Sequence, residues 1–286
     1  MKVLVTGVAG QLGADVVKRL NALKIENIGA DVQDFDLTDQ AAVYAFVTAA
    51  APDVIVHCAA YTNVDKAETE PELCMAVNGQ GTMNLARAAR RVGAAMLYVS
   101  TDYVFPGDGE EPFETDAPLG PKNIYGLSKL QGEEAVQSLL TNFYIVRTSW
   151  VFGLNGRNFV RTMLRLGKEK ESLRVVDDQI GSPTYTVSLA LVICDLIRSG
   201  KYGIYHATNT GYCSWADFAE EIMRQARLRC SIERVTSEEY GSAVRRPKNS
   251  RMSLQSLVSA DIPLPETWQE ALAGYLRELK ETEGSL

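Results

Sequence analysis

Short apolar runs alternate with longer amphipathic segments through the first half of the chain. The apolar runs predict five strands, near residues 2–6, 27–30, 53–57, 95–99 and 143–147. The segments between them have helical spacing and predict helices near 39–50, 71–92 and 122–139. A regular alternation of strand and helix is typical of a parallel sheet covered on both faces. The pattern therefore predicts an α/β fold of the Rossmann type, with a doubly wound parallel sheet.

The first strand leads into a glycine-rich turn and then a predicted helix over residues 14–23. Gly7, Gly10 and Gly13 have the spacing G-x-x-G-x-x-G between these two elements. Glycines at such a turn let the backbone approach a phosphate closely, and the helix N-terminus offers free N–H groups to an anion. The turn therefore predicts a dinucleotide-binding loop. The alternative is a glycine-rich turn with no ligand.

An acidic residue follows at the distance expected for a ribose contact. Asp31 comes after the second predicted strand, about 20 residues beyond the glycines. Its carboxylate can accept hydrogen bonds from ribose hydroxyls and would repel a 2′-phosphate, which favours NADH over NADPH. Asp36 is the next candidate and is expected near the adenine. The alternative for Asp31 is an ordinary acidic residue of a turn.

After residue 150 the pattern becomes less regular, which predicts two parts. Residues 1–150 are expected to form the dinucleotide-binding domain and residues 151–286 mainly a substrate-binding lobe. The apolar run at 202–206 predicts another strand, so part of 185–207 is a candidate to return to the first domain. A helix is predicted near 214–228, with Ser214 as its cap and Asp217 at the third helical position.

Composition narrows the class of protein. The chain has 286 residues, of which 46% are hydrophobic and 23% charged, as in a globular enzyme. Its net charge of −7 offers no basic field to nucleic acid or to an anionic membrane. No apolar run approaches the ~18 residues of a membrane span. The 5 cysteines are scattered, without a C-x-x-C motif, which favours reduced thiols and a cytoplasmic protein.

The two histidines give no sign of a metal site. His57 and His206 have no ligand spacing, so no catalytic metal is predicted. His57 ends an apolar run, and we interpret it as a core histidine rather than a catalyst.

Tyr125 and Lys129 stand four residues apart in the helix predicted near 122–139. Residues with this spacing share one face of a helix. A nearby ammonium group would lower the pKa of the Tyr125 phenol, so that it could exchange a proton with a substrate oxygen near neutral pH. The alternative is a solvated helix face. Together with the glycine turn, the pair predicts a reductase.

Several polar or small residues follow the predicted strands, where a parallel sheet binds its ligands. They are Ala59, Ala60, Ser100, Thr101, Thr148, Ser149 and Trp150. Thr101 is expected to hydrogen-bond the substrate carbonyl or the phenol of Tyr125, where a donor stabilises developing negative charge. Its alternative is a strand-end turn. Trp150 is either a core residue or a platform for a sugar.

Two further features remain open. Asn78, within the helix predicted at 71–92, could kink that helix or hold a water for proton relay, or it could simply bond to backbone. Arg245, Arg246 and Arg251 surround a proline and have the fork geometry that suits a diphosphate. The alternative for these arginines is a solvated charge run.

These motifs carry a resemblance to a known family. The glycine turn and the Tyr125-x-x-x-Lys129 pair resemble the extended short-chain dehydrogenase/reductases. More narrowly, six runs resemble the dTDP-4-dehydrorhamnose reductase family, and they extend the resemblance from residue 1 to about residue 252. They are Val64-Asp65-Lys66-Ala67-Glu68, Glu70-Pro71-Glu72-Leu73, Ser100-Thr101-Asp102-Tyr103-Val104-Phe105-Pro106-Gly107, Arg147-Thr148-Ser149-Trp150-Val151, Asp178-Gln179-x-Gly181-x-Pro183-Thr184 and Arg246-Pro247-x-Asn249-Ser250-Arg251.

The resemblance implies a reaction and roles for its residues. The reaction is the NADH- or NADPH-dependent reduction of dTDP-4-dehydro-β-L-rhamnose to dTDP-β-L-rhamnose, which supplies a sugar donor for surface polysaccharide. Tyr125 would donate the proton, Lys129 would assist it and Thr101 would tune the site. The substrate-binding set is Thr101, Asp102, Tyr125, Trp150 and Arg246. The cofactor-binding set is Gly7, Gly10, Gln11, Leu12, Asp31, Asp36, Leu37, Ala59, Ala60, Tyr61, Thr62, Val99, Tyr125 and Lys129.

The resemblance leaves the assembly and two other functions open. Some members pair through a metal held by acids, but Asp15 is shorter than the acid expected there and Val187 replaces a second one. A monomer or a homodimer without metal is therefore expected. One alternative function is a related sugar-nucleotide epimerase or dehydratase. The other is a regulatory subunit resembling the beta subunit of methionine adenosyltransferase, against which the intact Thr101, Tyr125 and Lys129 set speaks.

Overall fold

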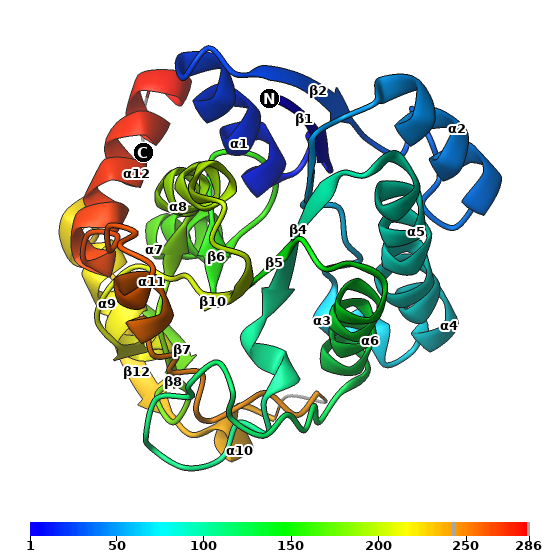
Figure 1. Ribbon diagram of the computed structural model, residues 1–286. Coiled ribbons are helices and arrows are strands. Elements are labelled where there is room, and N and C mark those ends of the chain that lie inside the picture. The colour runs from blue at the N-terminus through cyan, green and yellow to red at the C-terminus, as the bar shows by residue number, and fades with distance from the viewer. Residues whose placement is uncertain (242–243, 285–286) are drawn as a thin grey trace.

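A six-stranded parallel sheet lies at the centre of the computed structural model, which describes residues 1–241 and 244–284 (Figure 1). The strand order is β10-β5-β4-β3-β1-β2, and every neighbouring pair is parallel. The strands are β1 (Lys2–Thr6), β2 (Glu26–Ala30), β3 (Val54–His57), β4 (Ala95–Thr101), β5 (Phe143–Thr148) and β10 (Gly203–His206). The predicted Rossmann-type α/β fold is confirmed, and the run at 202–206 joins the sheet beside β5.

Helices cover both faces of this sheet (Figure 1). On one face lie α1 (Gln11–Ala22) and α8 (Thr186–Ser199), which pack against each other and share one hydrophobic core with the sheet. On the other face lie α2 (Gln40–Ala50), α5 (Thr82–Val92) and α6 (Ile124–Leu139). Because the central strands are buried on both faces, their residues are apolar without alternation, which is why the apolar runs predicted them correctly.

Some predicted boundaries differ from the observed ones. The helix predicted at 71–92 is divided into α4 (Pro71–Met75), a π-helical segment η1 (Ala76–Gly81) and α5. The first helix begins at Gln11 rather than at residue 14, because Gly10 already has the extended backbone of a cap. Strands β4 and β5 run on to Thr101 and Thr148, so these residues end the strands rather than follow them.

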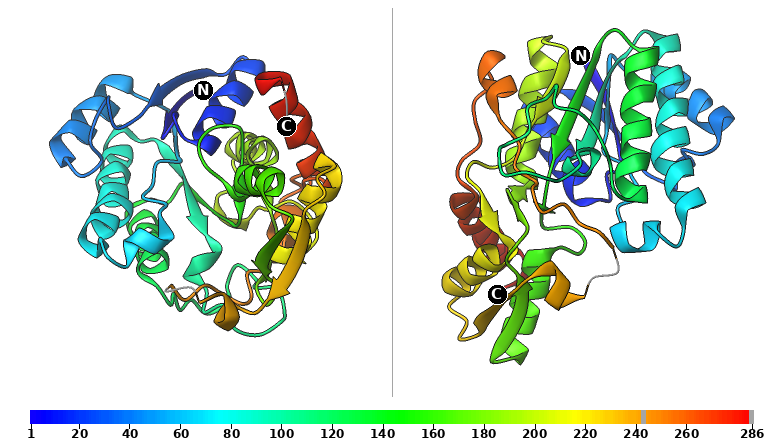
Figure 2. Two further views of the ribbon diagram at one scale, coloured as in Figure 1. Left: turned by 180° about the vertical axis from the view of Figure 1, so that it is seen from behind. Right: turned by 90° about the horizontal axis from the view of Figure 1, so that it is seen from below.

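A lobe with its own hydrophobic core lies to one side of the sheet layers, at the lower left in the right-hand view of Figure 2. It is built from α7 (Phe159–Glu169), α9 (Trp215–Ala226), α12 (Trp268–Glu283) and the strand pair β7 (Ser172–Val176) and β12 (Ser231–Val235). Two short pairs adjoin it: β6 (Val151–Phe152) with β9 (Thr184–Tyr185), and β8 (Ile180–Gly181) with β11 (Cys213–Ser214). The capping box of Ser214 and Asp217 starts α9, as predicted. The division at residue 150 stays a prediction.

Short helices complete the chain: α3 (Val64–Ala67), η2 (Asp102–Val104), α10 (Ser237–Tyr240) and α11 (Gln255–Ser259). The C-terminal α12 returns to α1, where Lys18 forms an ion pair of 2.7 Å with Glu278 (Figure 1). Within residues 1–241 and 244–284, none of the helices has the length and apolar character needed to span a membrane.

Candidate active site

A cavity of about 810 Å³ opens at the carboxyl ends of the sheet strands. Most of the residues predicted to form a site line this one cavity. They are Gly7, Gly10, Gln11, Leu12, Asp31, Asp36, Leu37, Ala59, Ala60, Thr62, Val99, Ser100, Thr101, Asp102, Tyr125, Lys129, Thr148, Ser149 and Trp150. The chain thus brings the glycine turn and the Tyr125–Lys129 pair together, although more than a hundred residues separate them.

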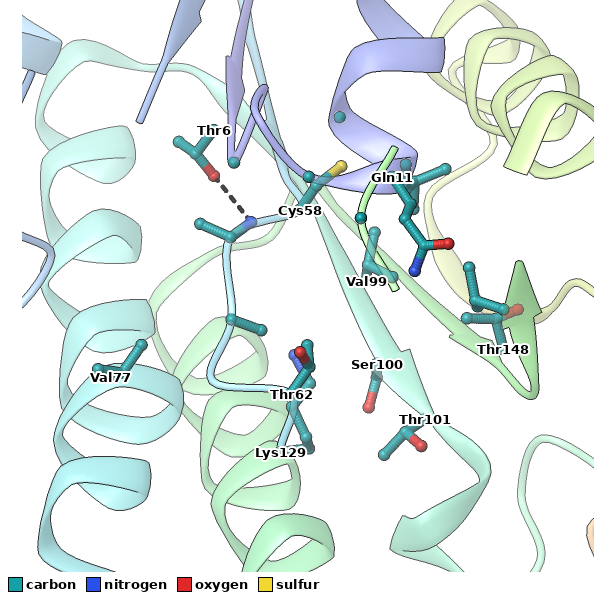
Figure 3. Close-up of a pocket in the computed structure, with 18 of the residues that line it drawn as sticks. Thr6, Gln11, Cys58, Thr62, Val77, Val99, Ser100, Thr101, Lys129 and Thr148 are labelled. Carbon is teal, nitrogen blue, oxygen red and sulfur yellow. Dashed lines mark hydrogen bonds between the residues drawn. The ribbon is translucent and has the colours of Figure 1, made fainter. Parts of the chain in front are cut away.

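Side chains from three elements surround the middle of the cavity (Figure 3). Ser100 and Thr101 come from the end of β4, Lys129 from the facing helix α6, and Gln11 from the start of α1. Gln11 Oε1 accepts hydrogen bonds from the Gly153 amide (2.9 Å) and from Asn158 Nδ2 (3.0 Å). The first turn of α1 is therefore fastened to the segment that leads into the lobe.

The glycine turn fits a pyrophosphate. Gly7 has φ of +74°, and a Cβ there would lie 2.7 Å from the Cα of Ala59. At Gly13 a Cβ would lie 2.2 Å from the carbonyl oxygen of Gly7. Gly10 caps α1 without any side-chain hydrogen bond, so the free N–H groups of the first helical turn are left to a ligand. Only glycine allows this close turn, and its open amides suit a dinucleotide phosphate.

Two carboxylates line the part of the cavity where the sequence predicts the adenosine. Asp31 Oδ2 accepts the Ala9 amide and Oδ1 accepts the Val32 amide, both at 2.8 Å. Asp36 accepts the amide and the hydroxyl of Thr38, each at 2.8 Å, and these bonds lower the pKa of Asp36. The backbone of the glycine turn thus fixes the Asp31 carboxylate where the sequence predicts a ribose contact.

Tyr125 and Lys129 reach the cavity from α6, but their pKa values differ from the prediction. Lys129 is only 3% exposed, and its Nζ lies 4.0 Å from the centre of the Tyr98 ring. Burial lowers the pKa of Lys129 to about 7. Burial also raises the pKa of Tyr125, the Asp102 charge raises it further, and a hydrogen bond with Thr101 lowers it. The prediction that Lys129 makes Tyr125 more acidic is therefore wrong for this structure, because desolvation dominates both groups.

Two buried polar atoms beside this pair are not fully hydrogen-bonded within the described residues. Asp102 Oδ1 accepts a hydrogen bond from the Thr101 hydroxyl (3.0 Å), and the Ser250 hydroxyl also interacts with this carboxylate, whereas Asp102 Oδ2 and Thr148 Oγ1 have no hydrogen bond of ordinary geometry there. Burial raises the pKa of Asp102 to about 6. Unpaired buried polar atoms are costly, so these two are suited to hydrogen-bond a polar ligand in the cavity.

Asn78 connects the segment after β3 to helix α6. Its Oδ1 accepts the Tyr61 amide (2.8 Å), and its Nδ2 donates to the Tyr61 carbonyl (3.0 Å) and to Ser128 Oγ (2.9 Å). It lies in the π-helical segment, where the Thr82 hydroxyl donates to the Asn78 carbonyl at 2.6 Å. Of the alternatives for Asn78, the structure shows backbone bonding together with an irregular helix.

His57 is a core residue, as expected. It hydrogen-bonds Thr6 Oγ1 at 2.7 Å and stacks on the ring of Tyr98. Burial lowers its pKa to about 3, so the ring is neutral at physiological pH.

Two predicted ligand residues do not line the cavity. The Tyr61 hydroxyl donates to Glu70 at 2.5 Å, which raises the pKa of Tyr61 to about 12. Arg246 forms an ion pair of 2.6 Å with Asp65 and lines a neighbouring cavity of about 390 Å³ together with Arg245.

Arg251, the third arginine of this group, lies in neither cavity. Its Nη1 donates to Asn249 Oδ1 at 3.0 Å. In the sequence these arginines looked like one group because they are close in number, but their side chains turn to different partners.

Sequence reasoning missed a buried ion pair beneath the site. Glu133 accepts hydrogen bonds from Arg147 Nε (2.9 Å) and Nη2 (2.7 Å) and from the Ser100 hydroxyl (2.5 Å). Both charged side chains are almost fully buried. The sequence spacing could have indicated Glu133, because it follows Lys129 by four residues, as Lys129 follows Tyr125, and so lies on the same face of α6.

Sequence reasoning also missed Trp215, which stacks on Trp150 in the cavity wall. The two ring centroids are 3.7 Å apart, with an angle of 12° between the planes. Trp150 therefore lies in the wall of the cavity rather than in the core. Nothing in the local pattern links these residues, since one follows a sheet strand and the other opens a helix of the lobe.

Comparison with known proteins gives consistent matches along the chain. The family described as "RmlD substrate binding domain" matches residues 1–281. The spore coat polysaccharide biosynthesis protein SpsK of Bacillus subtilis is 44% identical over 277 residues, covering 97% of each chain.

Two solved structures are similar throughout. A dTDP-4-dehydrorhamnose reductase from Clostridium acetobutylicum has a TM-score of 0.96 and 42% identity, covering 98% of this chain and 100% of that one. The Bacillus anthracis dTDP-4-dehydrorhamnose reductase, solved in complex with NADP, has a TM-score of 0.94 and 42% identity, covering 97% and 99%.

Proposed function

The chain belongs to the dTDP-4-dehydrorhamnose reductase family, and from that membership we propose that it reduces the 4-keto group of dTDP-4-dehydro-β-L-rhamnose to give dTDP-β-L-rhamnose. The electron donor is NADH or NADPH. One observation carries the proposal: Thr101, Tyr125 and Lys129 line the same cavity as the glycine turn, whose cap residue Gly10 makes no side-chain hydrogen bond to the first helical turn. Proton-donating groups and a dinucleotide site then share a space in which a sugar can lie between them.

The residues at one end of this cavity are suited to hold the dinucleotide. The amides at the start of α1 would bind its pyrophosphate, and Asp31 would bind the adenosine ribose. When bound, the reduced nicotinamide supplies the hydride that is transferred to C4 of the sugar. Asp31 would repel a 2′-phosphate, so we expect NADH to be preferred.

Tyr125 supplies the proton. Its pKa is raised, so the phenol is protonated at neutral pH and can donate to the C4 oxygen as negative charge develops there. Thr101, in contact with both Tyr125 and Asp102, orients the phenol toward that oxygen. Hydride at carbon and proton at oxygen convert the ketone to an alcohol and leave a phenolate. Lys129, with a pKa of about 7, can stabilise this phenolate and return a proton to it.

Other residues are suited to bind the substrate. Asp102 Oδ2, which has no hydrogen bond of ordinary geometry among the residues that the structure describes, can accept one from a sugar hydroxyl, and the Thr148 hydroxyl can donate or accept one. Trp150 offers an aromatic surface to the ring. A contact between Arg246 and the substrate diphosphate remains a prediction. It would require the diphosphate to reach the neighbouring cavity, which Arg246 lines together with Arg245.

The decisive experiment measures loss of reduced nicotinamide absorbance with freshly generated dTDP-4-dehydro-β-L-rhamnose. Tyr125→Phe should lower kcat by about 100-fold or more, because it removes the proton donor and leaves the dinucleotide contacts in place. The Kd for NADH should stay within about twofold of the wild-type value.

Tyr144→Phe is the matched control. It removes a phenol hydroxyl from a buried tyrosine outside the cavity and should retain activity. A Tyr125→Phe enzyme with most of its activity would contradict the proposed proton donor. Tightly bound NAD⁺ in the purified protein would favour the epimerase or dehydratase instead.

We place this reaction in the cytoplasm and expect a monomer or a homodimer. All five cysteines are free, as in proteins of reducing compartments. Measurement of the molar mass in solution tests the oligomeric state.

A further inference from the structure

The wall of the cavity contains a stacked pair of tryptophans from two parts of the chain. Trp150 follows β5 of the central sheet, and Trp215 is the first residue of α9 in the lobe. Their nearly parallel rings, 3.7 Å apart, both line the cavity. Trp215 is backed in turn by Phe159, with ring centroids 4.6 Å apart. The lobe thus supports the aromatic surface that the sheet presents to the substrate.

Trp150 has a backbone conformation that requires support. Its φ is +49°, in the left-handed region that non-glycine residues rarely adopt. The neighbouring backbone is anchored, since the Trp150 carbonyl accepts the Thr184 amide (3.1 Å) and the Ser149 hydroxyl donates to the Ser182 carbonyl (2.8 Å). A strained residue held on both sides indicates that the direction of the Trp150 indole is fixed by its surroundings.

Gly181 makes a second close contact with the Trp150 indole. A Cβ at Gly181 would lie 2.8 Å from Trp150 Cε2 and 3.0 Å from Trp150 Cζ2. Gly181 belongs to β8, which pairs with β11, and β11 leads directly into Trp215. Gly181 and the residue that precedes Trp215 therefore lie in one small sheet, which fixes the position of Gly181 relative to Trp215.

We propose that Trp215 and Gly181 are positioning residues that hold the Trp150 indole in place, and that this arrangement sets how tightly the hexose of a nucleotide-sugar substrate is bound. The inference rests on the proposed function and assigns a specificity role to the lobe. Trp215 acts through Trp150 by stacking on it. Gly181 has no side chain, and this leaves the space that the Trp150 indole occupies.

The test is a kinetic comparison of three variants. Trp215→Ala should raise the KM for dTDP-4-dehydro-β-L-rhamnose about three- to tenfold, the effect of losing one aromatic stack, with a smaller change in kcat. Trp215→Phe keeps a flat ring and should recover part of this loss. Gly181→Ala should raise the same KM with Trp215 intact, because its Cβ would lie 2.8 Å from Trp150 Cε2 and 3.0 Å from Ser250 Cβ and so would push on the indole. The KM for NADH should stay within about twofold in all three.

Matched controls separate positioning from general damage. Gly274→Ala places a Cβ on α12 where the nearest atom is Tyr185 Cε1 at 3.8 Å, and it should leave both KM values unchanged. Trp268→Phe removes the third tryptophan, which is buried in the lobe core, and should also leave them unchanged. Thermal unfolding of each variant shows whether it is folded at the assay temperature.

A spectroscopic signal reports the stack without turnover. Two indoles at this distance couple excitonically and give paired circular dichroism bands. Trp215→Phe and Trp150→Phe should remove this pair of bands, whereas Trp268→Phe should retain it. Loss of the bands with no change in the sugar-nucleotide KM or in product binding would overturn the proposal.

Binding of dTDP-β-L-rhamnose, measured by calorimetry, distinguishes failure of this proposal from failure of the proposed function. A wild-type protein that binds this product but does not turn over would contradict the proposed reaction. Weaker product binding by Trp215→Ala would still support the positioning role in that case. If the wild-type protein neither reduces the substrate nor binds the product, both proposals are wrong.

Discussion

Asp102 is a buried carboxyl that lines the cavity of the proposed active site. Its side chain is 3% exposed, the hydroxyls of Thr101 and Ser250 interact with its carboxylate, and Oδ2 has no hydrogen bond of ordinary geometry within the described residues. With a pKa of about 6, it is mostly ionised at pH 7. The fold therefore contains a desolvated charge to which a sugar hydroxyl could donate a hydrogen bond. Such a group lowers the stability of the free protein and is typical of a functional site.

Replacing this carboxyl should change how stability depends on pH. The folded-state pKa is raised from 3.8 to about 6, so the contribution of Asp102 to wild-type stability is full below pH 4 and is lost as pH rises through 6. Asp102→Asn lacks this titration. Relative to the wild type, it should gain on the order of 2 kcal/mol between pH 4 and pH 7, measured by urea unfolding at several pH values.

Asp261→Asn is the control for this titration. Asp261 is exposed and pairs with Lys201, which lowers its pKa, so its replacement should show no such gain. A constant difference between Asp102→Asn and the wild type across this pH range would show that burial does not raise the pKa of Asp102.

At the scale of elements, the Glu133–Arg147 pair joins helix α6 to two strands. Glu133 lies on α6, Ser100 on β4 and Arg147 on β5, and all three meet in one hydrogen-bonded group. Arg147 also donates to the Thr115 carbonyl at 2.9 Å. This group fixes the helix that carries Tyr125 against the strand that carries Thr101.

Removing the charge of only one residue of this pair should lower the free energy of unfolding more than removing both charges. Glu133→Gln leaves a buried guanidinium without its counter-charge and should lower the free energy of unfolding by roughly 3–5 kcal/mol. The double variant Glu133→Leu, Arg147→Met removes both charges and should recover part of that loss. Urea unfolding of Glu133→Leu, of Arg147→Met and of the double variant completes the cycle and measures the coupling. Strictly additive effects would show that the two side chains act independently.

At the scale of the whole molecule, residues of both the sheet and the lobe line the cavity, and side-chain contacts join the two parts beside it. Gln11 of the glycine turn bonds to Gly153 and Asn158, and Lys18 of α1 pairs with Glu278 of α12. A dinucleotide that binds at the start of α1 therefore contacts a part of the molecule to which the lobe is also fastened.

Dinucleotide binding should accordingly stabilise the protein as a whole. At a concentration of about 100 times Kd, the gain is about 2.7 kcal/mol, seen as a rise in Tm. NADH should raise Tm more than NADPH at equal concentration, and Asp31→Asn should reduce that difference. Gly13→Ala should remove the rise, since its Cβ would meet the Gly7 carbonyl oxygen at 2.2 Å. The same rise with Gly13→Ala would contradict the assigned phosphate site.

The sequence by itself determined the sheet, the glycine turn and the spacing of Tyr125 and Lys129. Strands buried on both faces must be apolar throughout, and residues four apart must share a helix face, so both features are local and can be read from the chain. The boundaries of the π-helical segment could not be predicted from the local sequence. They depend on residues such as Asn78, whose side chain bonds to Tyr61 and Ser128 only in the folded protein.

Only the tertiary structure decided which distant side chains meet and how burial alters them. It paired Glu133 with Arg147, stacked Trp215 on Trp150 and turned Arg246 toward Asp65. It also raised the pKa of Tyr125, against the direction that its spacing from Lys129 had suggested. The physical reason is that desolvation and long-range contacts arise from the packing of segments far apart in the chain, and a local pattern carries no information about that packing.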